Sequence, residues 1–204
     1  DAILDALARR GVSTLCVDQP GTGETLRIHG LPATHESERW ASKAVDWLET
    51  QGDVDAGRIG MTGISLGGYY APRAVAFEPR FACGAVWGAN HNWAEVQQKR
   101  LKREGENPVP HYWAHVMWVF GASDMEDFLA RAAGMHLNGV MERIRVLFPA
   151  PFGPTRPTTA FARTPPDPTT SRSSGIVSPQ NLCCLYTGCG GRTGTSRGRM
   201  AQSI

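Results

Sequence analysis

The sequence predicts an α/β protein in which helices cover a parallel sheet. Three short apolar runs have the length of buried strands, at residues 12–17, 58–64 and 81–87. Two segments with the helical spacing of apolar residues lie between them, at residues 36–51 and 66–77. Strands that alternate with helices in this way are typical of a parallel sheet with helices on both faces.

The first three elements are predicted to be a helix, a strand and a turn. The apolar residues of the helix share one face: Ile3, Leu4 and Leu7. Gly11 ends this helix, because glycine readily adopts the left-handed conformation that follows a helix. The run VSTLCV at residues 12–17 then predicts a strand, and the Pro and Gly residues of DQPGTG at residues 18–23 predict a turn.

The helix predicted at residues 36–51 is strongly amphipathic. Its apolar residues recur at i, i+4, i+7 and i+8: Trp40, Ala44, Trp47 and Leu48. Two Glu residues in its first turn and Gly52 after its last turn favour these ends. The chain then predicts a strand at residues 58–64 (RIGMTGI), a helix at residues 66–77 and a buried strand at residues 81–87 (FACGAVW).

From Asn90 the pattern becomes helical, and no strand is predicted between residues 92 and 142. Large side chains are frequent in this segment: Trp93, Tyr112, Trp113, Met117, Trp118, Phe120 and Phe128. An insertion of about 50 residues is longer than the connection that two parallel strands need. We therefore expect a helical cap at about residues 90–142. Ile144–Phe148 predicts the start of one more strand, and the pattern stops there, so residues 1–148 are predicted to form a partial folded domain.

Residues 149–204 differ sharply from the rest of the chain. They contain eight Pro, seven Gly, six Ser and nine Thr, and six Arg against the single acidic residue Asp167. Their net charge is +5, which leaves −3 for residues 1–148. Such a composition buries too little apolar surface to offset the entropy of ordering a chain. We predict a largely disordered tail, of the composition that a GC-rich gene gives when it is translated out of frame.

Two functional interpretations of this tail are weaker. Its Arg residues are scattered and few aromatic residues accompany them, which argues against a nucleic-acid-binding tail. Cys183, Cys184 and Cys189 are candidate metal ligands, but no His lies near them in the sequence. The five cysteines of the whole chain include no CxxC pair, which argues against structural zinc and a disulfide framework and favours a reducing compartment.

The composition of the whole chain is that of a globular protein. Its 204 residues are 41% hydrophobic and 20% charged, and a net charge of +2 gives little attraction for nucleic acid or an anionic membrane. No apolar run approaches the roughly 18 residues of a membrane-spanning helix, and the first residues lack the features of a signal peptide. We expect a cytoplasmic protein that begins inside a longer chain, and the sequence leaves its oligomeric state open.

The segment Gly63-Ile64-Ser65-Leu66-Gly67 matches G-x-S-x-G, the pattern of a nucleophile elbow. A predicted strand precedes it and a predicted helix follows it, as the elbow requires. Its glycines leave room where a tight turn brings strand and helix together. Ser65 is then predicted to project above the carboxyl edge of the sheet, and the backbone N–H of Leu66 to face a developing oxyanion. The alternative is a glycine-rich turn with an incidental serine.

With these motifs the chain resembles the α/β-hydrolase family. The matching pieces occur in the family's order: DQPGTG at 18–23, RIG at 58–60, GISLGGY at 63–69, FEPRF at 77–81, WG at 87–88 and the cap-like block from Asn90. Within the family it is most similar to the branch of FrsA-type esterases, dihydroxypseudooxynicotine hydrolase and polyketide-shortening hydrolases. The resemblance covers residues 1–148. It implies an ester, amide or C–C bond hydrolase that forms an acyl-serine at Ser65, acts on a small carbonyl compound and needs no cofactor or metal.

The chain departs from the family after its elbow. Family members place an acid and then a His after the nucleophile, but no acidic residue lies between the strand predicted at Ile144–Phe148 and Asp167, and no His follows His136. The family's first strands and its second oxyanion donor would precede Asp1. The resemblance thus implies a hydrolase truncated at both ends, with triad acid and base unassigned and activity impaired. The alternative is a non-catalytic fragment that at most binds a ligand.

Two pairs of residues could replace the missing groups. Asp124 and His136 follow the elbow in the right order, but both fall within the predicted cap. His91 and Glu95 follow the strand next to the elbow, where they lie either near the mouth of a pocket or simply at the polar start of a helix.

Overall fold

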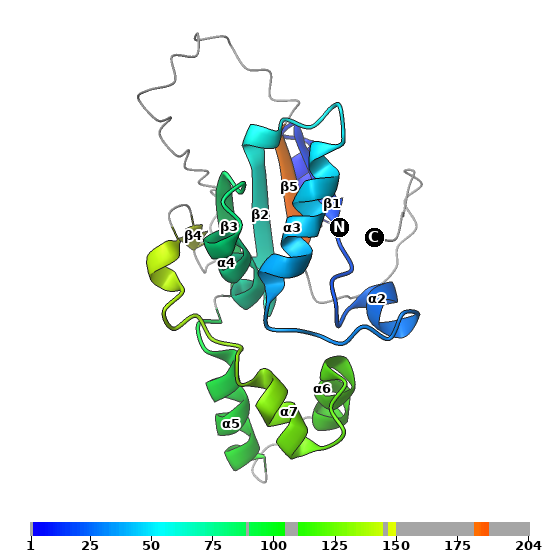
Figure 1. Cartoon of the computed structure of the whole chain (residues 1–204), viewed down its shortest axis with the longest axis vertical. Helices are drawn as coiled ribbons and strands as arrows, with labels where there is room; N and C mark the ends of the chain where they lie inside the picture. The colour runs from blue at the N-terminus through cyan, green and yellow to red at the C-terminus, as the bar shows by residue number, and fades with distance from the viewer. Residues whose placement is uncertain (1, 89, 105–109, 145–146, 150–181, 188–204) are drawn as a thin grey trace.

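The computed structural model describes residues 2–88, 90–104, 110–144, 147–149 and 182–187. Its sheet has five parallel strands in the spatial order β1-β5-β2-β3-β4 (Figure 1). The strands have these bounds: β1 Val12–Cys16, β2 Ile59–Ile64, β3 Cys83–Trp87, β4 Leu147–Pro149 and β5 Leu182–Thr187. The predicted parallel α/β architecture is therefore confirmed.

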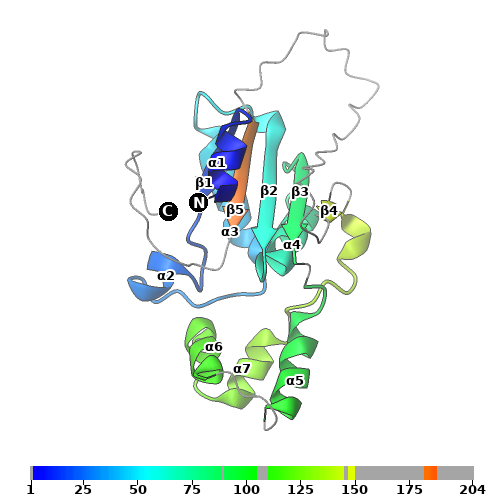
Figure 2. The same cartoon turned by 180° about the vertical axis from the view of Figure 1, so that it is seen from behind.

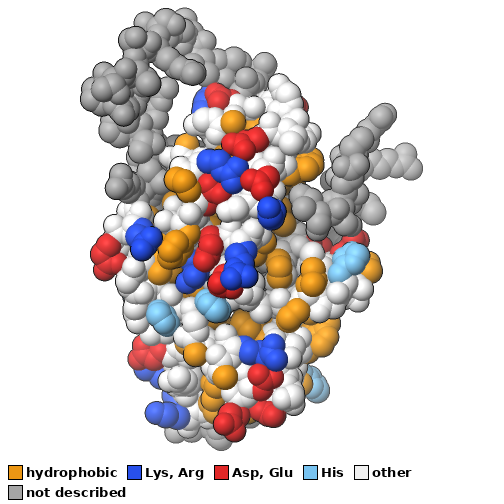
Figure 3. Space-filling model, in the orientation of Figure 1, with side chains coloured by type: hydrophobic (Ala, Val, Ile, Leu, Met, Phe, Trp, Pro, Cys, Tyr) orange, Lys and Arg blue, Asp and Glu red, His pale blue; other side chains and the backbone are white. Residues whose placement is uncertain are grey.

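Helices cover both faces of this sheet. Helices α3 (Ser37–Glu49) and α4 (Gly67–Phe77) pack side by side on one face, and α1 (Ala2–Ala8) lies on the other (Figures 1 and 2). Over α3 and α4, basic and acidic side chains lie intermixed on the surface (Figure 3). The short helix α2 (Gly23–Arg27) follows the predicted turn and was not expected, because five residues are too few to show a helical period.

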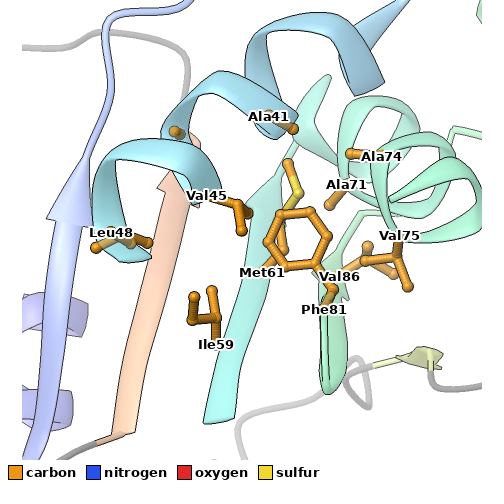
Figure 4. Close-up of a cluster of buried hydrophobic side chains, with 11 residues drawn as sticks. Ala41, Val45, Leu48, Ile59, Met61, Ala71, Ala74, Val75, Phe81 and Val86 are labelled. Carbon is orange, nitrogen blue, oxygen red and sulfur yellow. The ribbon is translucent and has the colours of Figure 1, made fainter. Parts of the chain in front are cut away.

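The main core lies between α3, α4 and the sheet (Figure 4). Its buried side chains come from α3, α4, β2, β3 and the segment before β3: Ala41, Ala44, Val45, Leu48, Ile59, Met61, Ala71, Ala74, Val75, Phe81 and Val86. The predicted apolar stripe of α3 faces this core, with Ala44 and Leu48 buried and Trp40 and Trp47 packed at its border. Burial of this stripe is the main reason for a helix here, since helices of this length gain most of their stability from tertiary packing.

Three further helices lie beyond the carboxyl ends of the strands (Figure 1). They are α5 (Trp93–Arg103), α6 (Tyr112–Phe120) and α7 (Met125–Ala132). They form a second core with the first turn of α4 and the segment after α7: Tyr69, Tyr70, Trp93, Ala94, Val116, Phe120, Phe128, Ala132, Met135, Leu137 and Val140. The helical pattern predicted for this part of the chain is present, with two short additions, the antiparallel bridge Asn92–His136 and the 3₁₀ turn η2 (Met141–Arg143).

Strand β5 is a regular element within residues 149–204, for which the sequence predicts a largely disordered tail. It lies between β1 and β2 and pairs with both, Leu182 opposite Val12 and Cys183 opposite Ile59. The run LCCLYT has the length and apolar character of a buried strand, but the Pro- and Gly-rich composition around it hides this signal. Pairing on both sides satisfies its backbone groups. Apart from Pro149, the last residue of β4, the rest of the predicted tail, including Cys189, lies outside the described residues.

No helix among the residues described combines the length and the apolar character that crossing a membrane requires.

Candidate active site

Ser65 occupies the sharp turn between the end of β2 and the start of α4. Its φ angle is 58°, in the left-handed region, and its side chain is exposed. For a residue with a side chain this conformation costs about 1–2 kcal/mol, and such strain is concentrated at functional sites. The structure thus places Ser65 on the strained turn, at the carboxyl edge of the sheet, that the elbow pattern predicts.

Two glycines flank this turn, and Gly63 is the one that allows the strand and the helix to come this close. A β-carbon on Gly63 would collide with the carbonyl group of Gly67, at the start of α4. A β-carbon on Gly88, just after β3, would lie 3.6 Å from the Cα atom of Ser65, and Gly88 itself has a φ of 84°. The Ser65 turn is therefore enclosed by backbone on two sides.

Three hydrogen bonds hold the backbone of Ser65. Its N–H donates to the carbonyl oxygen of Trp87, the last residue of β3, at 2.8 Å. Its own carbonyl oxygen accepts from the N–H of Gly68 at 2.8 Å and from Nδ2 of Asn90 at 2.7 Å. Sequence reasoning missed Asn90, since the pair is separated by 25 positions and no local pattern joins them.

The backbone N–H of Leu66 is available to a ligand. Leu66 is the N-cap residue of α4, and among the described residues its N–H has no hydrogen-bond partner. The first N–H groups of a helix have no partner within the helix, and the helix dipole adds a partial positive charge there. This N–H can therefore donate to an oxyanion formed next to Ser65.

Within the described part of the chain, no hydrogen bond joins the Ser65 hydroxyl to a histidine or a carboxylate. Of the candidate bases, His91 places its Nε2 atom 3.1 Å from Oδ1 of Asn138, and the buried Nδ1 atom of His136 has no hydrogen-bond partner among the residues described. No recorded interaction connects either ring to Ser65.

The candidate acids have structural roles in the observed fold. Asp124 is the N-cap of α7 and accepts a hydrogen bond from the Asp127 N–H at 2.9 Å, which holds the pKa of Asp124 below its ordinary value. Glu95 lies in the first turn of α5 and pairs with Lys99 at 2.6 Å. Among residues with described side chains, no cluster of His, Cys, Asp or Glu could hold a metal ion; the side chains of Cys183, Cys184 and Cys189 are not among them.

Tyr69 connects the elbow helix to the segments around it. Its side chain is fully buried, and its hydroxyl is shared between the carbonyl oxygens of His35 at 2.8 Å and Gly134 at 3.0 Å. Burial raises the pKa of Tyr69 to about 12, so the hydroxyl remains a donor at physiological pH. The sequence carries no signal for this contact, because its partners are 34 and 65 positions away.

Comparison with known proteins identifies hydrolases throughout. The sequence model described as "Alpha/beta hydrolase family" matches residues 1–189. The hydrolase acrC of Aspergillus aculeatus is 26% identical over 164 residues, which are 67% of this chain and 38% of that protein. The 2,6-dihydropseudooxynicotine hydrolase of Paenarthrobacter nicotinovorans is 37% identical over 79 residues, which are 39% of this chain and 21% of that protein.

The fold has a counterpart among solved structures. The crystal structure of 2,6-dihydroxy-pseudo-oxynicotine hydrolase superposes with a TM-score of 0.54 at 24% identity, covering 65% of this chain and 35% of that one. At this identity the likeness concerns the fold alone. The chain spans less than two fifths of the length of each of these relatives.

Proposed function

The chain belongs to the alpha/beta hydrolase family, and we propose that it carries the nucleophile side of a serine hydrolase site. The turn between β2 and α4 is the observation that carries this proposal. It holds Ser65 in a left-handed conformation with an exposed side chain, next to the N–H of Leu66, which has no partner in the described part of the chain. The proposed substrate is a small carbonyl compound, cleaved at an ester, an amide or a C–C bond beside the carbonyl.

In the proposed reaction, the hydroxyl oxygen of Ser65 attacks the carbonyl carbon while a base removes the hydroxyl proton. The carbonyl oxygen becomes an oxyanion, which the N–H of Leu66 stabilises. The tetrahedral intermediate collapses to acyl-Ser65, and the leaving group departs with a proton. Water then hydrolyses the acyl group, so that the sequence of steps needs neither a cofactor nor a metal ion.

We propose that this activity is impaired in the chain by itself. The described residues supply no base to Ser65, and the sequence contains no His after His136. In a serine protease, loss of the catalytic His lowers turnover by about 10⁶-fold. Removal of the hydroxyl proton should therefore limit the rate, and a small external base should accelerate it.

Helices α5–α7 are the proposed cap. They lie beyond the carboxyl ends of the strands, and their core includes Tyr69 together with the partly buried side chain of Leu66. The cytoplasmic location and the absence of nucleic-acid and membrane partners stay predictions.

A non-catalytic binding module is the second candidate. It is favoured by the lack of a base at the Ser65 hydroxyl among the described residues. In this case the elbow would persist as an architectural feature, and a ligand would bind under the helices without being cleaved.

Covalent labelling by a fluorophosphonate, read as the mass of the intact protein, separates the two candidates. The first predicts slow labelling that disappears in Ser65→Ala and is accelerated by added imidazole, which supplies the base. Ser13→Ala is the matched control, because Ser13 is exposed on β1 and should be dispensable. A wild-type protein that stays unlabelled with imidazole would favour the binding module, and labelling that survives in Ser65→Ala would contradict the assignment of the nucleophile.

A further inference from the structure

We propose that Asn90 is a positioning residue that aims the oxyanion donor of this site. This inference rests on the proposed serine hydrolase function. Asn90 lies in the loop after β3 and is half-buried. Its Nδ2 group donates to the carbonyl oxygen of Ser65 at 2.7 Å and lies 3.3 Å from the carbonyl oxygen of Gly88. Its backbone N–H donates to the carbonyl oxygen of Gly68 at 3.4 Å. Asn90 therefore connects the nucleophile, the end of the neighbouring strand and the first turn of α4.

The position requires an amide donor. Both groups around the Asn90 side chain, the carbonyls of Ser65 and Gly88, are acceptors only. The NH₂ end of the amide must face them, and a carboxylate of the same shape would place an oxygen against two oxygens. Asp at this position would thus repel the groups that Asn binds.

The hydrogen bond from Asn90 to the Ser65 carbonyl also orients the Leu66 N–H, because one peptide bond joins the two groups. The carbonyl of Ser65 and the N–H of Leu66 belong to the same planar unit and point in opposite directions in a trans peptide, and the structure contains no cis peptide among its described residues. A donor that fixes the direction of the Ser65 carbonyl consequently fixes the direction of the Leu66 N–H.

The Ser65 turn needs this support because its left-handed backbone is intrinsically unfavourable. Without Asn90, the Ser65 carbonyl keeps only the Gly68 N–H as a donor among the described residues. The peptide between Ser65 and Leu66 can then rotate, and a displacement of about 1 Å in a catalytic group can lower a rate about 100-fold.

Asn92 offers a matched control two residues away. It is the N-cap of α5, and its side-chain oxygen accepts a hydrogen bond from the N–H of Glu95 at 3.0 Å. Asp caps a helix as well as Asn does. The same Asn→Asp change should therefore be harmful at position 90 and harmless at position 92.

The test compares wild type, Asn90→Asp, Asn90→Ala and Asn92→Asp in the full chain. The rate constant of fluorophosphonate labelling should fall at least about tenfold in both Asn90 variants and stay within about twofold in Asn92→Asp. The NMR amide signal of Leu66 should move in the Asn90 variants alone. Thermal unfolding of each variant identifies any general loss of structure. If the carboxylate added in Asn90→Asp unfolds the protein, Asn90→Ala still tests the loss of the amide donor.

Each outcome decides the role of Asn90. The positioning role would be overturned if the folded Asn90 variants were labelled as fast as the wild type and the Leu66 amide signal did not shift. If the wild type is not labelled even with added imidazole, the proposed hydrolase function fails, and the Leu66 signal decides alone. Its movement in Asn90→Ala but not in Asn92→Asp supports the positioning role, whereas an unchanged signal rejects it.

Discussion

The carboxylate of Glu78 should make the stability of this protein depend on pH. Glu78 follows α4 on the way to β3, and only 4% of its surface is exposed. Its two carboxylate oxygens accept hydrogen bonds from the guanidinium of Arg80 at 2.9 and 2.7 Å, and one of them also accepts the Arg80 backbone N–H at 3.0 Å. Glu78→Gln preserves the shape of this side chain and removes its charge.

The magnitude follows from the effect of Arg80 on this carboxyl group. Its hydrogen bonds outweigh burial and lower the pKa of Glu78 from an ordinary 4.5 to about 2. Because the folded pKa is the lower one, the stabilisation is present above pH 4.5 and is lost as the pH falls toward 2. The full shift corresponds to about 3.4 kcal/mol. The Arg80 side chain is 32% exposed and keeps Asp46 and Glu49 as partners, so we expect Glu78→Gln to lose about 2 kcal/mol.

Urea unfolding between pH 3 and pH 7, followed by tryptophan fluorescence, measures this loss. The difference in the free energy of unfolding between wild type and Glu78→Gln should be largest above about pH 6 and fall to about two fifths of that value at pH 3. Glu95→Gln is the control, because the Glu95–Lys99 pair is exposed to solvent and solvent-exposed ion pairs contribute little to stability. A Glu78→Gln difference that is equal at pH 7 and pH 3, or no larger than that of the control, would refute the reasoning.

Three further substitutions test the fold around the candidate site. Gly63→Ala should destabilise the protein by at least about 2 kcal/mol in thermal unfolding, because its β-carbon would collide with the first residue of α4. Tyr69→Phe should lose about 1–2 kcal/mol in urea unfolding, since two backbone carbonyls lose a shared donor while the ring packing is kept. Cys184→Pro, unlike Cys184→Ala, should speed hydrogen exchange in β1 and β2, because proline cannot donate within a central strand; unchanged exchange would contradict the pairing of β5.

Sequence prediction succeeded where a few neighbouring residues suffice to define an element. The helix expected at residues 36–51 is α3 at Ser37–Glu49, and the strand expected at residues 58–64 is β2 at Ile59–Ile64. The turn at Ser65 was predicted for the same reason, since G-x-S-x-G places the serine and its two flanking glycines within five positions. Strand β5 was missed, because a strand of six residues leaves only a weak signal within a tail rich in Pro, Gly and Thr.

The sequence by itself determined the α/β class, the resemblance to hydrolases and the choice of Ser65 as candidate nucleophile. Only the tertiary structure decided that residues 182–187 lie between β1 and β2, that Asn90 binds the carbonyl of Ser65 and that Asp124 caps a helix. The periodicity of apolar residues and the demands of a tight turn are local, so a linear pattern records them. Contacts between distant segments arise when buried polar groups find partners in the packed fold. No local pattern in the sequence reveals which partners those are.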